Sequence, residues 1–243
     1  MHETFPEGEA DGASVARAGR HASGASEQEI TDRIFAAVIE QRLPPGTKLS
    51  ENVLCDAFGT SRARIRRALL MLAQREVVEL QSNRGAFVAR PSAENARHVF
   101  AARRAIEPTV IRDAAERITK AQLTALRGHV RAETTAQAAG QRHEAIRLSG
   151  VFHVRLAEIG GNPVITRIVA ELVARTSLII GLFGAASTSC SEGDHRLLLA
   201  AIAARDPDGA AQLMTRHLSH IEKDLELADA AAAPIDVRAV LAV

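Results

Sequence analysis

The chain has 243 residues, of which 47% are apolar, and this is enough for one large or two modest domains with cores of their own. Its formal net charge is only +1, so any affinity for nucleic acid must come from a local basic patch rather than from the whole molecule. Tryptophan and tyrosine are absent, which disfavours proteins that stack aromatic side chains on single-stranded DNA or on RNA.

The cysteine usage indicates a reducing compartment. Cys55 and Cys190 lie far apart and form neither a metal-binding spacing nor a disulfide framework. The apolar runs are too short to span a membrane, and no segment resembles a signal peptide. We therefore expect a cytoplasmic protein with no membrane partner.

The N-terminal third is expected to hold an arm and a small domain. Residues 1–26 are rich in Gly, Ala, Ser and Glu without periodicity, and they predict a disordered arm. A helix is expected from Glu27, with its end before Pro44. Two further short helices are expected at 50–58 and from about 61 to 72, with Gly59 in the turn between them. This arrangement is a helix-turn-helix.

The second of these short helices has one apolar side and one basic side. Thr60 or Ser61 is a suitable N-cap, and Ile65, Ala68, Leu69 and Leu72 recur with helical period. Its arginines are Arg62, Arg64, Arg66 and Arg67, and no carboxylate occurs in the sequence between Asp56 and Glu76. Such a helix suits the major groove of DNA, where guanidinium groups bind phosphates and guanine edges. The alternative is a solvated cationic face on an ordinary surface helix.

A β-hairpin is expected after this helix. Residues 77–81 and 86–89 have strand character, and the turn between them contains Arg84. This hairpin predicts a wing, whose tip would place Arg84 in an adjacent minor groove or against the DNA backbone.

These features resemble the winged helix-turn-helix of the GntR family of bacterial transcription regulators. The matching segments are 44–51, 59–62, the arginine-rich helix and 83–88. The resemblance implies that Arg62 and Arg66 are the main DNA contacts, and that Asn52, Arg64 and Gly85 are secondary ones; we add Ser61 and Arg84 as candidates. The family usually carries a glutamate after the second main arginine, where this chain has Arg67.

Residues 92–228 are expected to form an all-α domain. Six helices are predicted, at 92–117, about 119–138, 141–159, 163–183, 189–204 and 207–227. Their starts are marked by a capping-box pattern at Thr119–Gln122 and by the pairs Asn162–Pro163 and Asp206–Pro207. Residues 229–243 are expected to be a tail. The predicted fold class is therefore mostly α: an N-terminal winged helix-turn-helix followed by a helical bundle.

Three histidines on three different predicted helices are candidate metal ligands. They are His153, His195 and His217. Converging imidazoles in a bundle can hold Zn or Ni with positions left for water or a ligand. The alternative is that each histidine is a surface residue or a hydrogen-bonded core residue.

The second domain resembles the FCD effector domain of FadR-type GntR regulators. The matching pieces are 103–107, 152–156, 161–162, 194–198 and 210–218. In that family a metal is often held by one aspartate and three histidines, which match His153, His195 and His217. The aspartate position is occupied by Ser149 here, so the metal is expected to depend on the histidines, water or the effector.

The resemblance also implies a small organic acid as effector. We expect Arg103, Ser149 and Asn162 to contribute to its site, with Arg103 directed at a carboxylate. The alternative for Arg103 is a surface salt bridge with Glu107, four residues later.

Together these features predict a ligand-responsive repressor, not an enzyme, that binds an inverted-repeat DNA operator as a homodimer. The alternative function is a metal-dependent hydrolase with an accessory basic domain. That reading needs a general base near the histidines, for which Glu158 and Asp194 are candidates.

Overall fold

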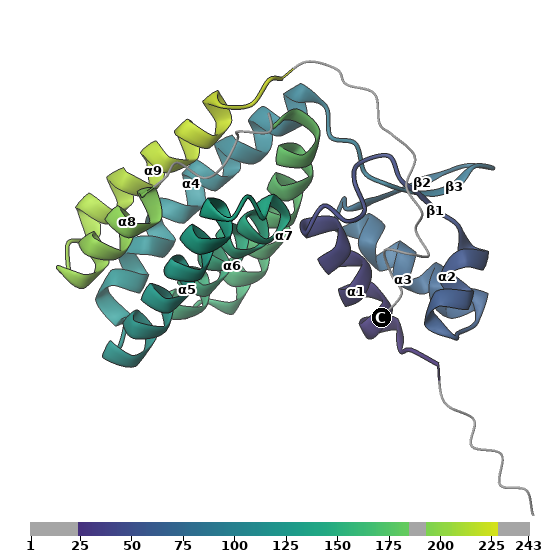
Figure 1. The fold of residues 1–243 in the computed structure, drawn as a ribbon, viewed down its shortest axis with the longest axis horizontal. Coiled ribbons are helices and arrows are strands. Elements are labelled where there is room, and N and C mark those ends of the chain that lie inside the picture. Colours follow the sequence, from purple (N-terminus) through teal and green to yellow (C-terminus); the bar gives the residue numbers. More distant parts are fainter. Residues whose placement is uncertain (1–23, 185–192, 228–243) are drawn as a thin grey trace, which may run out of the picture.

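The structure, a computed structural model, describes residues 24–184 and 193–227. Figure 1 shows a small N-terminal body in purple and blue beside a long helical bundle in teal, green and yellow. The predicted fold class is confirmed: a winged helix-turn-helix is followed by an all-α bundle. The predicted tail at 229–243 and nearly all of the predicted arm at 1–26 lie outside the described residues, as does Cys190.

The N-terminal body contains three helices and three short strands. They are α1 (Glu27–Ile39), β1 (Lys48–Leu49), α2 (Glu51–Phe58), α3 (Arg62–Gln74), β2 (Val78–Gln81) and β3 (Gly85–Val88). A capping box of Ser26 and Glu29 begins α1. Gly59 ends α2 in the left-handed conformation, at φ 58°, which a glycine adopts without steric cost. This residue makes the tight turn that sets α3 against α2.

The wing is a three-stranded antiparallel sheet in the order β1-β3-β2. β2 and β3 form the predicted hairpin, with Val78 opposite Val88. The strand β1 was not predicted; its two residues pair with β3, Lys48 opposite Phe87 and Leu49 opposite Ala86. A two-residue strand carries no periodicity of its own, so only its pairing with β3 defines it.

Within residues 92–184 and 193–227 of the described chain, the bundle consists of the six expected helices. They are α4 (Ala93–Arg117), α5 (Lys120–Ala138), α6 (Arg142–Gly160), α7 (Pro163–Phe183), α8 (Asp194–Ala203) and α9 (Pro207–Lys223). The side chains of Thr119, Asn162 and Asp206 cap the starts of α5, α7 and α9, as predicted.

Two predicted ends differ from the structure. The described part of α8 begins at Asp194 rather than 189, after a stretch that the structure does not describe. The helix α9 ends at Lys223 rather than Leu227, because the chain turns so that Leu225 forms an antiparallel bridge with Gly184 at the end of α7. This isolated bridge is a β contact in a region where no strand was predicted.

The helix α7 is rich in apolar residues and lies in the middle of the molecule (Figure 1). Val169 and Val173 face the core of the bundle, and Ile179 faces α4. Ala174 and Leu178 are fully buried in the core of the winged domain. The first turns of α7 are partly exposed, whereas most side chains from Val169 to Phe183 are buried, because this part of the helix contributes to the cores of both domains.

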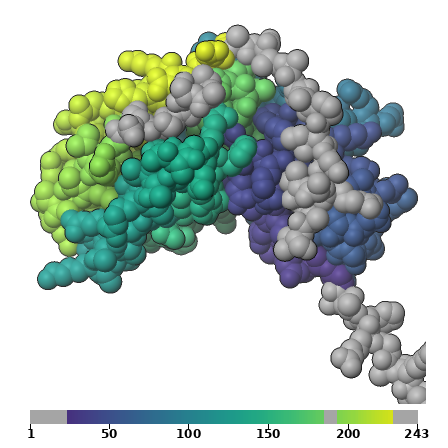
Figure 2. Space-filling model, in the orientation of Figure 1, coloured from purple at the N-terminus to yellow at the C-terminus, as the bar shows by residue number. Residues whose placement is uncertain are grey.

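The two domains are therefore in direct contact. In Figure 2 the purple surface around α1 lies against the teal and green surface of the bundle. Within the described residues, no helix has the length and apolarity that a membrane crossing requires.

Candidate functional site

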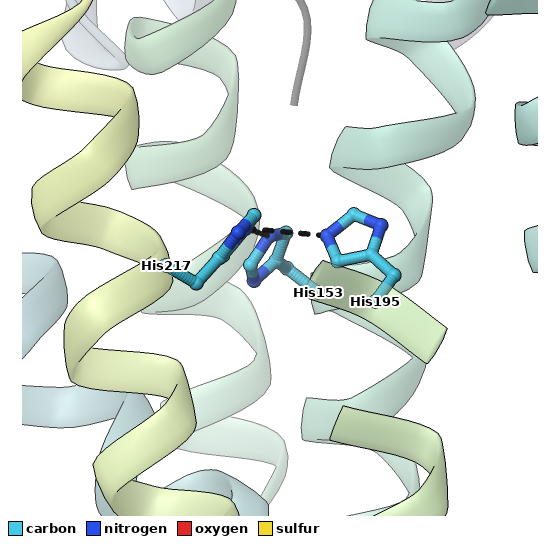
Figure 3. A group of neighbouring side chains, drawn as sticks. All are labelled: His153, His195 and His217. Carbon is cyan, nitrogen blue, oxygen red and sulfur yellow. Dashed lines mark hydrogen bonds between the residues drawn. The ribbon is translucent and has the colours of Figure 1, made fainter. Parts of the chain in front are cut away.

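The three predicted histidines come together in the interior of the bundle. His153 on α6, His195 on α8 and His217 on α9 are all buried, and their rings point toward one another in Figure 3. The Nε2 atom of His217 lies 3.2 Å from Nε2 of His195 and 3.3 Å from Nε2 of His153. One potential ligand atom from each histidine lies within 4.8 Å of the other two.

Each histidine is held on its other nitrogen by a different carboxylate. Nδ1 of His153 lies 2.5 Å from Glu107 of α4, and Nδ1 of His195 lies 2.7 Å from Glu133 of α5. Nδ1 of His217 lies 3.2 Å from Asp194. A carboxylate only accepts hydrogen bonds, so it favours the tautomer with the proton on Nδ1. This leaves the lone pairs on the three converging Nε2 atoms.

Burial keeps His153 neutral. Removal of the ring from water lowers the pKa of His153 to about 4, although the charge of Glu107 opposes the shift. Burial by itself would raise the pKa of Glu107, but the charge of Arg103 and the hydrogen bonds from His153 and Arg103 outweigh it and lower that pKa. At neutral pH, Glu107 is therefore a carboxylate and His153 a neutral imidazole.

These residues fit a divalent transition metal. Neutral imidazoles are common ligands of Zn and Ni. Two nitrogens bound to one tetrahedral zinc lie about 3.3 Å apart, given Zn–N bonds of about 2.0–2.1 Å. The two Nε2 separations agree with that value. The carboxylates behind the rings are the outer partners that orient metal-binding histidines.

Arg103 extends this network toward α7. Its Nε donates to Glu107 over 2.5 Å, and its Nη1 donates to the hydroxyl of Thr176 over 3.2 Å. The salt bridge with Glu107, which the sequence allowed as the alternative to an effector contact, is formed, but both side chains are buried rather than on the surface. Nη2 of Arg103 is also buried and has no hydrogen-bond partner among the described residues. This donor is suited to an anionic ligand.

A second set of contacts continues from α7 to the winged domain. The side-chain nitrogen of Gln41 donates to the carbonyl of Ser177 over 3.3 Å. Arg142 of α6 donates to the side-chain oxygen of Gln41 over 3.4 Å and to the carbonyl of Gly184 over 3.2 Å. Since Thr176 and Ser177 are consecutive, the residues around His153 and the end of α1 meet the same turn of α7.

The other two expected effector residues differ in their surroundings. Ser149 is half-buried on α6, one turn before His153. Asn162 is exposed and caps α7, where its side-chain oxygen accepts from the amides of Val164 and Ile165. Its side chain has a structural role at the start of that helix.

The expected DNA-contacting residues lie on α2, the start of α3 and the wing. Arg62 and Arg66 are exposed on the first two turns of α3, and Asn52 is exposed on α2. Ser61 caps α3 by accepting from the amide of Arg64, whose own guanidinium donates to the carbonyl of Gly24.

The arginine cluster is less isolated than the sequence suggested. Arg66 pairs with Glu51 of α2 at 2.8 Å, and Arg67 pairs with Glu27 of α1 at 2.6 Å. The neutralising carboxylates come from other helices, so a scan along α3 misses them. Arg67, which stands where the family usually has a glutamate, ties α3 to α1.

The wing presents the remaining two candidates. Arg84 is exposed at the turn, with its guanidinium 5.6 Å from the ring centre of Phe87. Gly85 has φ 97° and open space where a Cβ would lie. A larger residue there would be strained by its backbone conformation rather than by a clash.

Comparison with known proteins identifies both halves. Residues 26–88 match the gntR family of bacterial regulatory proteins, and residues 98–220, half of the chain, match the FCD domain. The chain belongs to the GntR family and carries an FCD domain.

Relatives and solved structures agree with this assignment. The chain is 26% identical over 200 residues to the HTH-type transcriptional repressor RspR of Escherichia coli K12, covering 82% of this chain and 88% of RspR. It is 28% identical over 217 residues to the repressor NanR of Cronobacter sakazakii, covering 80% of each chain. A GntR regulator from Rhodococcus sp. RHA1 has the same fold, with a TM-score of 0.73, 22% identity and coverage of 81% of this chain and 95% of that one.

This GntR protein is thus a DNA-binding transcription regulator with a domain for small-molecule effectors. Nothing in the comparisons supports the hydrolase alternative. Glu158, one general base considered for it, is exposed, and Asp194 is engaged with His217.

The sequence reasoning missed Glu133 and the role of Glu107 behind the histidines. Glu133 lies on the predicted helix 119–138 at a buried position, and a carboxylate on the apolar side of a helix is the signal that could have indicated it.

Proposed function

We propose that this protein is a homodimeric transcriptional repressor whose affinity for an inverted-repeat operator depends on a metal and a small organic acid in the bundle. The observation that supports this most directly is the convergence of three Nε2 atoms, each backed by its own carboxylate. Its relatives RspR and NanR are both named as repressors, which supports repression rather than activation. We place the protein in the bacterial cytoplasm, where its operator lies.

The DNA contacts follow from exposure and position. Arg62 and Arg66 are the main contacts in the major groove, and Asn52, Ser61, Arg64, Arg84 and Gly85 are secondary ones. When the protein binds DNA, Arg66 leaves its ion pair with Glu51 and contacts the DNA instead. This is feasible because its guanidinium is largely exposed and the ion pair is accessible to solvent. One winged helix contacts few base pairs, so a dimer on two half-sites provides the required affinity.

The ligand site consists of His153, His195 and His217 around a Zn or Ni ion, with the effector beside it. When bound, the ion supplies a positive centre that a carboxylate can ligate. Arg103 offers its unpaired Nη2 to the same acid, and Ser149 completes the proposed set. Asn162, which was also expected to contribute, caps α7 instead. Because Ser149 replaces an aspartate, the ion retains more positive charge here, so the acid and the metal are expected to bind cooperatively.

Communication between the sites rests on α7. A ligand that favours one position of Glu107 and Arg103 also affects Thr176, which accepts a hydrogen bond from Arg103. The next residue, Ser177, accepts a hydrogen bond from Gln41 of the winged domain. The ligand changes operator affinity only to the extent that it binds one arrangement of the two domains more tightly than the other.

The decisive experiment is a mobility-shift titration on the DNA upstream of the protein's own gene. It compares chelator-treated protein with Zn- or Ni-loaded protein, with and without succinate, citrate or lactate. We expect a specific complex whose affinity changes with metal and acid. Arg62→Ala should weaken it about tenfold or more, whereas Arg75→Ala, at the far end of α3, should not.

Two results would contradict the proposal. One is DNA affinity that is unchanged by Arg62→Ala and Arg66→Ala. The other is a monomer by light scattering at micromolar concentration, both alone and with DNA.

A further inference from the structure

A hollow between α5 and α8 on the bundle is distinct from the interior histidine site. The two helices pack side by side (Figure 1) and border an open cavity of about 470 Å³. That volume lies within the range of small-molecule sites, about 300–1,000 Å³. Val130 and Leu199 are buried at its floor.

Three arginines surround this cavity. Arg127 and Arg131 are one turn apart on α5, and Arg196 faces them from α8. All three are exposed, and none of their guanidinium groups has an ion pair or hydrogen bond with any described residue. No acidic side chain is among the described residues that line the cavity. Elsewhere in the described chain, arginines such as Arg66, Arg67 and Arg104 have carboxylate partners.

This combination selects for one class of ligand. Guanidinium groups bind carboxylate and phosphate in a planar, bidentate manner. Three unneutralised positive charges favour an anion with more than one negative charge. The apolar floor adds affinity for a hydrophobic body.

We propose that the α5–α8 cavity binds a small organic anion with a hydrophobic body and a carboxylate or phosphate head of two or more charges. This inference goes beyond the proposed function and does not depend on metal at the histidines. Thr134 also lines the cavity, and its hydroxyl donates to the carbonyl of Val130 over 3.0 Å.

The cavity lies directly behind one of the histidines. A smaller recess lined by Glu133, Gly193 and His195 shares Val130, Thr134 and Arg196 with it. Glu133 accepts from His195 at the bottom of this recess. An anion that binds Arg196 therefore contacts the residue next to His195, so its binding is expected to alter metal affinity at the histidines.

The test is calorimetric titration of the full chain with phenyl phosphate and with benzylsuccinate, which share a hydrophobic ring but differ in the anionic head. Inorganic phosphate and benzyl alcohol each lack one half of the proposed ligand. We expect saturable binding of at least one of the two amphipathic anions, and at least about tenfold weaker binding of inorganic phosphate and benzyl alcohol.

Variants assign the binding to this cavity. The double variant Arg131→Gln/Arg196→Gln should bind the probe at least about tenfold more weakly, while Arg97→Gln, an exposed arginine on α4, should bind as wild type. His195→Ala should still bind the probe, which separates this result from failure of the metal site. Circular dichroism and light scattering establish that the variants fold and assemble.

Three outcomes would overturn the proposal. Neither anion binds the wild type saturably, or the double variant binds as well as wild type, or inorganic phosphate binds as tightly as phenyl phosphate. If the wild type binds no probe and the double variant loses its dimer, the face is a contact between two copies of the chain instead.

Discussion

Gln41 of the winged domain donates a hydrogen bond to the carbonyl of Ser177, and the preceding residue, Thr176, accepts one from Arg103 in the bundle. Gln41 is buried and has φ 56°, which is uncommon for a non-glycine residue. Its side chain therefore occupies a defined place between α1, α6 and α7. This contact is a direct connection from the DNA-binding domain to the turn of α7 that meets Arg103.

Gln41→Ala is expected to uncouple the two sites. It removes the donor to Ser177 and the acceptor of Arg142 while leaving α3 and the histidines in place. Operator affinity and metal affinity should each persist, but the effect of metal and acid on operator affinity should fall by about 1 kcal/mol. Mobility-shift titrations with and without ligand measure this. Gln28→Ala, on the exposed side of α1, is the control; equal regulation in both variants would contradict the role of Gln41.

Glu51→Gln should strengthen operator binding. The change removes a carboxylate that pairs with Arg66 at 2.8 Å, and it also removes repulsion between Glu51 and DNA phosphates. Because such exposed pairs are weak, the expected gain is about threefold at low salt. Fluorescence anisotropy on labelled operator detects it. The same change in an Arg66→Ala background should give a smaller gain, and an equal gain would show that Glu51 acts independently of Arg66.

Glu133→Gln should weaken metal binding. The amide retains the shape of the side chain and one acceptor for Nδ1 of His195, but it loses the charge that strengthens the ligand. Loss of such an outer partner typically lowers metal affinity about 10- to 100-fold. Titration of Zn into chelator-treated protein measures the change. Glu116→Gln, on the surface of α4, should have no effect, and His195→Ala should abolish uptake; metal uptake by His195→Ala at wild-type affinity would refute the site.

Ser149→Asp should tighten metal binding and reduce its dependence on the organic acid. The substitution adds a carboxylate one turn before His153, at the position where the family usually has an aspartate. We expect at least about tenfold higher metal affinity, since a carboxylate is a better ligand than a hydroxyl. The gain in metal affinity on adding citrate should shrink in parallel. Ser82→Asp in the wing turn controls for net charge.

Stability should decline when the pH falls below about 6.5. Burial lowers the pKa of His153 to about 4 in the folded state, so between these values the unfolded chain binds the proton and the folded chain does not. Protonation of His153 therefore favours unfolding. The free energy of unfolding falls as the pH drops from 6.5 toward 4 and is regained when the pH returns to 6.5, the pKa of a histidine in the unfolded chain. Between pH 6.5 and 4 this site is expected to contribute a loss of about 1 to 3 kcal/mol.

Urea denaturation of metal-free protein across this pH range measures the loss. His153→Gln should flatten the dependence, and His143→Gln, on an exposed side chain, should not. An identical pH profile in wild type and His153→Gln would contradict the assignment.

Local signals made most of the fold predictable. The capping residues Thr119, Asn162 and Asp206 each act within three residues of their own position, so the sequence reveals them directly. The three histidines were found because metal-ligand chemistry restricts residue type and because the family pattern supplied their spacing. Their convergence is now visible in the structure, whereas metal occupancy stays a prediction.

What could not be predicted depends on contacts between distant segments. The pairing of Arg66 with Glu51 joins α3 to α2, and the position of Glu133 behind His195 joins α5 to α8. The strand β1 exists only through its partner β3. Periodicity reports which side of a helix is buried but not which residue covers it.

Leu178 and Ala174 of α7 complete the hydrophobic core of the winged domain. A polypeptide that ended at Pro91 would leave the area they cover open to water, and it would lose the corresponding part of its folding free energy. The two domains meet in the sequence near residue 91, but the folding free energy of the winged domain depends on residues beyond that point. A hybrid regulator that joins this winged domain to another effector domain will be stable only if the new domain supplies apolar side chains equivalent to Ala174 and Leu178.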